Sequence, residues 1–365
     1  MIPRKRKTND NSKDITALRA EYDERRKRRS EKNVEEILKN MDKLNDPEYN
    51  SDAGKVNGNN VSKLNNQSTV RTLSIAVPAS ILDNAQSAEL RTYLAGQIAR
   101  AACIFKVDEV IIFNDVKQDS SNEEYGYNPQ QSSFLFARIL QFLECPQYLR
   151  KNLFPIQQSL QYAGLLNPLD APHHLRATDE SDYREGIVTK LAPKPNVGSY
   201  VSIGLTKNVL VDRILEPDLR VTVKLEPNDG TGKLRGKIVS PSTPRTEAGL
   251  YWGYSVRIAS TLSQVFSDCP YDGAYDCTIG TSDKGDNCDV MDSQNLHQFD
   301  HILILFGGLY GLEAALEADT KVHVSDVRKL FDHYLNTCPN QGSRTIRTEE
   351  AILISLATLQ KYLPT

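Results

Sequence analysis

Three polar loops hold the side chains of this 365-residue chain that are best suited to bind a small molecule. They cover residues 279–285, 306–311 and 336–347, and each follows a short apolar run that is typical of a strand. Open α/β sheets bind ligands at the carboxyl ends of their strands, so these loops would meet if the strands are neighbours. Taken together, the loops predict a small-molecule pocket.

The third loop leads directly into a helix. Thr348 is expected to be the N-cap residue, with Glu349 and Glu350 in the first turn, where the helix dipole favours negative charge. Apolar residues then recur at helical spacing, at positions 352, 356, 359 and 363. The polar segment 336–347 has no such pattern, and loops of this composition often have a functional role.

The second loop, FGGLYG at 306–311, lies between a strand-like run and a good helix sequence. Its glycines would allow a ligand to approach the backbone closely, although a plain strand-to-helix turn explains them as well. The spacing fits neither G-x-G-x-x-G nor a P-loop, which disfavours a dinucleotide-dependent dehydrogenase.

Residues 240–254 form another unusual segment, with the only tryptophan, Trp252, and the cation Arg245. Arginine can bind phosphate through two parallel hydrogen bonds, and aromatic rings can stack on nucleobases. Alternatively, Tyr251, Trp252 and Tyr254 pack a junction between domains. The sequence leaves both interpretations open.

Cysteine and histidine residues show no pattern of metal ligands or of a catalytic triad. The six cysteines contain no C-x-x-C pair, and the six histidines have no matching spacing. We therefore predict no metal site, and we expect Cys338 to be a packing residue rather than a nucleophile.

The elements that would position these loops indicate an α/β fold with an inserted β-module. A strand at 73–77, a helix at 90–105 and a strand at 109–113 predict a parallel unit at 70–180. Strands at 275–279, 302–306 and 322–324 would continue it within 243–365. Five short strand-like runs within 181–242 predict a small OB-like β-barrel.

Residues 1–69 differ from the rest in composition. Residues 1–32 have 12 lysines and arginines against 6 acidic residues, although the whole chain has a net charge of −3. We expect a largely disordered tail and linker that could serve as a nuclear localisation signal or a nucleic-acid arm. No apolar run reaches the roughly 18 residues of a membrane helix, so no membrane partner is expected.

Several long motifs resemble the SPOUT-domain RNA methyltransferases, in the subgroup with an inserted OB-like module. The similarity starts near residue 71 and runs to the C-terminus, apart from the segment 114–132. The motifs include LYWGY at 250–254, IGTS at 279–282, FGGL at 306–309, NTCP at 336–339 and QGSRTIRTEE at 341–350.

The resemblance implies a trefoil-knotted α/β domain, a homodimer and S-adenosylmethionine as methyl donor. It implies methylation of a uridine at N3 in large-subunit ribosomal RNA, in the nucleus or nucleolus and the cytoplasm, with spindle, kinetochore or centrosome association in mitosis. The residues expected to bind the methyl donor are Thr281, Lys284, Gly307, Gly308, Leu309, Gly311, Asn336, Thr337, Ser343, Arg344, Thr345 and Ile346.

Three residues are candidates for the chemistry of the transfer. Uridine N3–H is a weak acid, so its methylation benefits from a general base or from groups that stabilise the deprotonated imide. Arg245 and Arg347 could stabilise negative charge or bind phosphate, and Glu349 could act as the base. The alternative is a non-catalytic RNA-binding or spindle-associated scaffold that has kept the fold.

Overall fold

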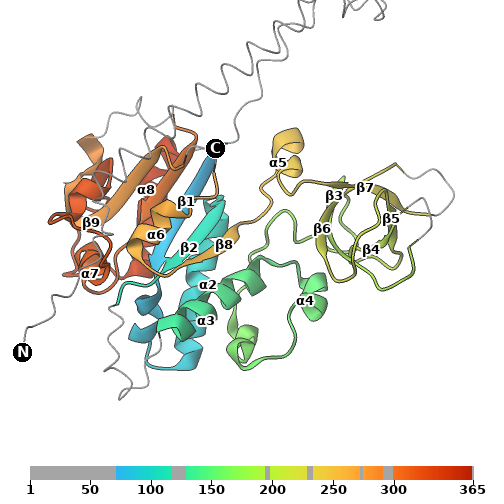
Figure 1. The fold of residues 1–365 in the computed structure, drawn as a ribbon, viewed down its shortest axis with the longest axis horizontal. Helices are drawn as coiled ribbons and strands as arrows, with labels where there is room; N and C mark the ends of the chain where they lie inside the picture. The colour runs from blue at the N-terminus through green and yellow to red at the C-terminus, as the bar shows by residue number, and fades with distance from the viewer. Residues whose placement is uncertain are drawn as a thin grey trace, which may run out of the picture.

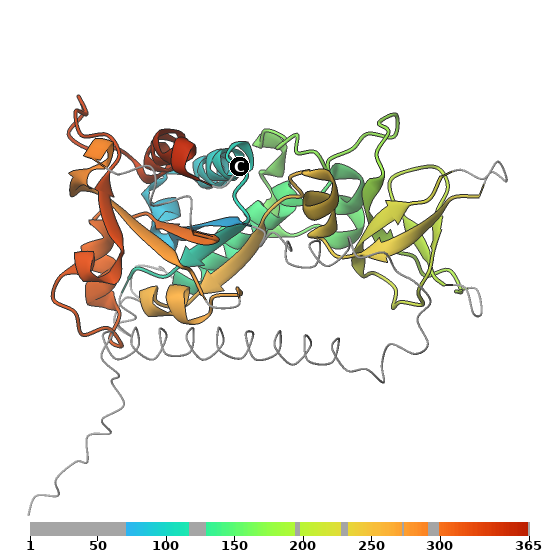
Figure 2. The ribbon, with the colours of Figure 1, turned by 90° about the horizontal axis from the view of Figure 1, so that it is seen from above.

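The computed structural model describes residues 71–116, 129–193, 198–227, 233–271, 274–290 and 299–363. An α/β domain lies at one end of the molecule and a small β-barrel at the other (Figures 1 and 2). The tail at 1–69, with its predicted disorder and basic clusters, lies outside the described residues.

The α/β domain contains a six-stranded, entirely parallel sheet in the order β11-β9-β10-β1-β2-β8. The N-terminal strand therefore lies in the centre, between β10 and β2. The strands are β1 Thr72–Pro78, β2 Glu109–Phe113, β8 Ser255–Ala259, β9 Cys277–Asn287, β10 His301–Leu305 and β11 His333–Asn336.

Helices cover both faces of the sheet because the strand side chains alternate between two cores. Ile75, Ile112 and Ile304 face a core that includes α2, α3 and α8. Ala76, Ile111 and Leu303 face a second core with α6, α7 and η7. The bounds of these helices are α2 Ala88–Ile104, α3 Pro129–Glu144, α6 Leu262–Ser267, α7 Gly311–Ala318, η7 Val327–Leu330 and α8 Thr348–Leu359.

The remaining helices are short segments in the connections. They are η2 Ala79–Asn84, α4 Gln147–Leu153, η4 Gln158–Leu160, η5 Ala163–Leu165, α5 Thr243–Ala248, η6 Cys288–Val290 and η8 Gln360–Tyr362. Among the described residues, we find no helix with the length and apolar character needed to span a membrane.

The predicted strand–helix–strand unit is confirmed by β1, α2 and β2, and β1 pairs with β2 in parallel. The strand predicted at 322–324 is wrong, because Val322 packs in the second core from a loop. The edge strand is instead β11, which is short and mostly polar. No pattern in the sequence predicts β8, which pairs with β2 along its whole length.

The predicted small barrel is confirmed as a closed five-stranded barrel in the order β3-β4-β5-β7-β6. It closes through the antiparallel pair of β3 and β6, and valines dominate its core. Its strands are β3 Tyr183–Val188, β4 Tyr200–Ser202, β5 Val209–Val211, β6 Arg220–Leu225 and β7 Arg235–Val239.

Candidate functional site

A cavity of about 920 Å³ lies beside the middle of β9 and at the carboxyl ends of β10 and β11. The predicted loops at 306–311 and 336–347 form one side of it, together with Thr281, Ser282 and Asp283. The loop predicted at 279–285 is wrong, because those residues continue the strand β9. The opposite side comes from η2 and α2, the elements that follow the central strand β1. The parallel sheet thus brings together segments that lie more than 200 residues apart in the chain.

The glycine loop after β10 is a tight turn. The Gly311 N–H donates to the Gly308 carbonyl at 3.1 Å, and Gly311 has a φ of +77°, which few other residues adopt. A Cβ on Gly307 would lie 2.9 Å from the Gly311 backbone. The turn itself therefore requires these glycines. Of the two interpretations of this motif, ligand approach and a strand-to-helix turn, the turn is the plainer one.

The buried carboxylate of Asp115 lies close to the same turn, beside Gly308. The Ser80 hydroxyl donates to Asp115 at 2.6 Å, and a Cβ on Gly308 would lie 2.8 Å from that carboxylate. Burial raises the pKa of Asp115, although the hydrogen bonds from Ser80 oppose this effect. A substitution at Gly308 would therefore disturb a buried polar contact in addition to the cavity.

The loop after β11 is tied to its neighbours by side-chain hydrogen bonds. The Asn336 amide donates to the Asp283 carbonyl at 2.9 Å and accepts from the Cys338 N–H, also at 2.9 Å. The Thr337 hydroxyl lies 2.7 Å from the hydroxyl of Ser355 in α8. These contacts fix the start of the loop, while its later residues, such as Arg344, are exposed to solvent.

A sequence model of the family described as "Putative RNA methyltransferase" matches residues 72–359, which include the sheet, the barrel and the cavity. The chain belongs to this family. It is 57% identical to the human "28S rRNA (uridine-N(3))-methyltransferase" over 79% of this chain and 78% of the human protein. The Drosophila melanogaster protein of the same name is 50% identical over 93% of this chain and 72% of the Drosophila protein.

Most of the residues predicted to bind the methyl donor line the cavity of this RNA methyltransferase. Arg347 and Glu349, two of the three candidates for the chemistry, line it as well. The predicted methyl-donor residues that line it are Thr281, Gly307, Gly308, Leu309, Gly311, Asn336, Thr337, Arg344, Thr345 and Ile346.

Lys284 and Ser343 are not among the lining residues. Lys284 is exposed, and its ammonium group lies 3.2 Å from Glu313. The Ser343 hydroxyl donates to the Thr345 carbonyl at 2.8 Å and so shapes the loop.

The prediction that Thr348 caps α8 is wrong. The helix begins at Thr348, and Arg347 is the N-cap residue. The Glu350 carboxylate accepts the Arg347 N–H at 2.9 Å, which satisfies a donor at the helix start. The Thr348 hydroxyl is free to donate to the Gly307 carbonyl at 2.9 Å, so it connects α8 to the glycine turn.

Arg245 lies outside the cavity of the methyltransferase. It belongs to α5, and its guanidinium forms an ion pair with Asp108 and donates to the Arg71 carbonyl at 2.7 Å. Burial raises the pKa of Asp108 to about 6 in spite of this ion pair. The structure thus gives Arg245 a role in attaching α5 to the sheet.

The side of the cavity formed by η2 and α2 is not predicted from the sequence. Its lining residues include amides and large apolar side chains: Asn84, Gln86, Leu90, Tyr93, Leu94 and Gln97. Only the pairing of β1 with β10 brings this segment next to the loops, and no local pattern reports that pairing.

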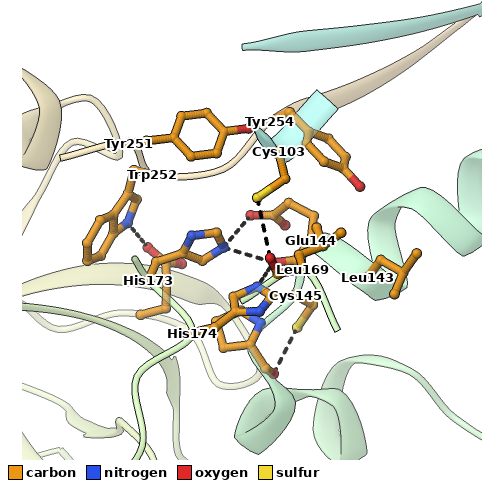
Figure 3. A network of polar contacts seen from close by, with 12 residues as sticks. Cys103, Leu143, Glu144, Cys145, Leu169, His173, His174, Tyr251, Trp252 and Tyr254 are labelled. Atoms are coloured by element: carbon orange, nitrogen blue, oxygen red, sulfur yellow. Dashed lines mark hydrogen bonds and ion pairs between the residues drawn. The ribbon is translucent and has the colours of Figure 1, made fainter. Parts of the chain in front are cut away.

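The aromatic segment at 251–254 packs the junction between the α/β domain and the barrel (Figure 3). The Trp252 indole donates to Glu185 in β3 at 2.6 Å. The hydroxyls of Tyr251 and Tyr254 donate to the Val107 and Leu140 carbonyls at 2.8 and 3.0 Å. All three rings are buried, so the packing interpretation is confirmed.

We call the charged centre of this junction the Glu144 cluster: Glu144, His173, Glu185, Arg220 and Trp252. Arg220 in β6 donates to both oxygens of Glu144 at 2.7 and 3.0 Å, and its Nε donates to Glu185 at 2.7 Å. His173 Nε2 lies 3.1 Å from Glu144 Oε1. Burial alone would raise the pKa of Glu144, but its bonds to His173 and Arg220 lower that pKa to about 2.

Proposed function

We propose that this protein transfers a methyl group from S-adenosylmethionine to N3 of a uridine in large-subunit ribosomal RNA. One observation carries the proposal: two of the predicted loops and β9 line one cavity inside the span that matches the RNA methyltransferase family. The names of the human and Drosophila relatives supply the substrate and the position of the methyl group.

The cavity residues fit a sulfonium methyl donor. A volume of about 920 Å³ is at the upper end of the range for ligand sites, so the cavity has room for the donor and for an acceptor base. Leu309 and Ile346 offer apolar contacts for an adenine ring, and Arg344 offers a cation for the carboxylate of the donor. When bound, the donor would supply an electrophilic methyl group.

The chain's own residues would then act on the uridine. Transfer to N3 requires loss of the N3 proton, and Glu349 lines the cavity as a candidate acceptor for it. Arg347 lines the same cavity and would stabilise the negative charge that develops on the imide. The target base must leave its stack to reach the methyl group, at a cost of a few kcal/mol.

We also propose that the α/β domain is knotted and that the barrel is OB-like. We further propose that two copies of the protein form a dimer through α2 and α8. The exposed apolar side chains on these helices include Leu90, Tyr93, Ile104 and Leu353. A second cavity of about 290 Å³ lies between the two helices. Burial of such a surface by a second copy would remove apolar area from water.

The methyl-donor site can be tested with Arg344→Ala. Its side chain is exposed, so the fold should be unaffected, while calorimetry should show weaker binding of S-adenosylmethionine and less label should reach 28S rRNA. Arg213→Ala, an exposed arginine on the barrel, is the matched control. Equal donor binding by the wild type and Arg344→Ala would contradict this site.

The reaction itself is tested by mapping modified uridines in ribosomal RNA from cells with and without this protein. We expect loss of a 3-methyluridine from the large-subunit RNA. If the purified protein binds RNA but not S-adenosylmethionine, a non-catalytic scaffold becomes the better description.

The proposed dimer is tested with Leu353→Glu, which should convert a dimer into a monomer in light scattering. An unchanged mass would contradict the α2–α8 interface.

The basic tail supports a proposal about location. The clusters at 4–7 and 25–29 are rich in arginine and lysine, as nuclear localisation signals are. We propose nuclear, nucleolar and cytoplasmic pools, and deletion of residues 1–45 should shift the protein toward the cytoplasm. An unchanged distribution would contradict a targeting role for the tail.

A further inference from the structure

Two large apolar side chains project into solvent from the tip of the glycine turn. Leu309 is 68% exposed and Tyr310 is 80% exposed. Among the exposed large hydrophobic residues of the described structure, no other tyrosine is as exposed as Tyr310. The turn itself is anchored, because Phe306 before it and Leu312 after it are buried in the two cores. The turn thus presents this pair on a fixed support.

The tip lies at the edge of the cavity that we assign to the methyl donor. Leu309 lines that cavity, and Tyr310 is the next residue. Core packing does not explain an aromatic ring that is mostly in water. Exposed apolar groups beside polar residues commonly mark an interaction surface.

Two cations lie close to the tip. A Cβ on Gly311 would lie 2.5 Å from a carboxylate oxygen of Glu313, whose other oxygen lies 3.2 Å from the Lys284 ammonium. Arg328 donates to the Lys284 carbonyl, and its guanidinium is 5.5 Å from the centre of the Tyr334 ring. Lys284 is therefore linked to the turn through Glu313, and Arg328 is linked to the Lys284 backbone; we call these two cations the basic edge.

An exposed aromatic ring beside cations is the chemistry by which proteins bind single-stranded RNA. Every base offers a flat face for stacking, and each phosphate offers a negative charge. We propose that Tyr310 stacks on a base of the acceptor RNA next to the target uridine, and that Lys284 and Arg328 contact the adjoining phosphates. This inference rests on the proposed function, since it assigns the place where that substrate binds.

The decisive experiment compares Tyr310→Ala with Tyr310→Phe. Stacking needs the ring and not the hydroxyl, so Ala should weaken binding to a 28S rRNA transcript about tenfold, whereas Phe should bind like the wild type. Binding of S-adenosylmethionine and the melting temperature should not change in either variant. Phe134→Ala, at a comparably exposed ring in α3, is the control and should bind RNA normally.

The basic edge has a separate signature in the salt dependence of binding. Each phosphate contact that is lost should reduce the slope of log K against log salt by about 1. We expect this reduction for Lys284→Gln, and no reduction for Arg213→Gln on the barrel. An unchanged slope for Lys284→Gln would remove the phosphate contact from the proposal.

The outcomes separate this inference from the proposed function. If the wild type methylates 28S rRNA and Tyr310→Ala binds RNA equally well, only the stacking role is wrong. If the wild type neither binds nor methylates this RNA, the proposed function fails first. If Tyr310→Ala changes the mass in light scattering from dimer to monomer, the tip belongs to a subunit interface and the inference is overturned.

Discussion

The Glu144 cluster and the large cavity are both rich in polar side chains, but they use them in opposite ways. In the cluster, Glu144, Glu185 and Arg220 each have two or more side-chain partners. In the cavity, Arg344 and Arg347 are exposed to solvent. A polar group with fixed buried partners contributes to stability, whereas an exposed one at a cavity is available to a ligand. Variants at the two regions should therefore separate stability from binding.

The largest expected effect is that of Arg220→Met. Methionine keeps much of the side-chain volume but leaves the carboxylates of Glu144 and Glu185 without their shared cation in a buried junction. Breaking such a pair from one side typically costs about 3 kcal/mol or more. Urea unfolding should show this loss, while the native variant should bind S-adenosylmethionine as the wild type does. A loss of S-adenosylmethionine binding without a loss of stability would contradict the assignment of stability to the Glu144 cluster and of binding to the cavity.

Acid should weaken the cluster in a defined pH window. The pKa of Glu144 is about 2 in the folded protein, against an ordinary value of 4.5 for a glutamate in the unfolded chain. Because the folded pKa is lowered, the contribution to the free energy of unfolding is complete above pH 4.5 and is lost as the pH falls through 2. That contribution is on the order of 3 kcal/mol.

Urea unfolding between pH 5 and 2.5 measures this contribution, and Glu144→Gln is the control without the titrating group. Between these limits the wild type should lose more stability than Glu144→Gln. Parallel profiles of stability against pH for the two proteins would show that the cluster does not stabilise the ionised form of Glu144.

A smaller effect is expected for Gly253→Ala in the aromatic segment. Gly253 has a φ of +90°, and a Cβ would lie 2.4 Å from Glu144 Oε1. The strained backbone and the displaced carboxylate should together cost about 2 kcal/mol. Gly342→Ala in the cavity loop is the matched control, because a Cβ there meets nothing within 4 Å. Similar melting temperatures for the two variants would contradict this difference.

The two regions also differ in how far the sequence predicts them. The alternation in β1 and the valine-rich runs of the barrel are local patterns, and they predict those elements well. The rule for parallel strands also predicts which loops meet. Arg245 was assigned to ligand binding because its partner, Asp108, lies 137 residues away. The η2–α2 side of the cavity was missed for the same reason, since it depends on long-range strand pairing.

The smallest effect should come from Thr348, which connects the helix start to the glycine turn. Thr348→Val keeps the shape of the side chain but removes its hydrogen bond to the Gly307 carbonyl, at an expected cost of about 1 kcal/mol. Because that bond positions the turn at the cavity, donor binding should weaken together with stability. Thr348→Ser keeps the hydroxyl and should retain both properties. If Thr348→Val loses stability but binds S-adenosylmethionine normally, the bond supports the fold alone, and stability and binding separate even where α8 meets the glycine turn.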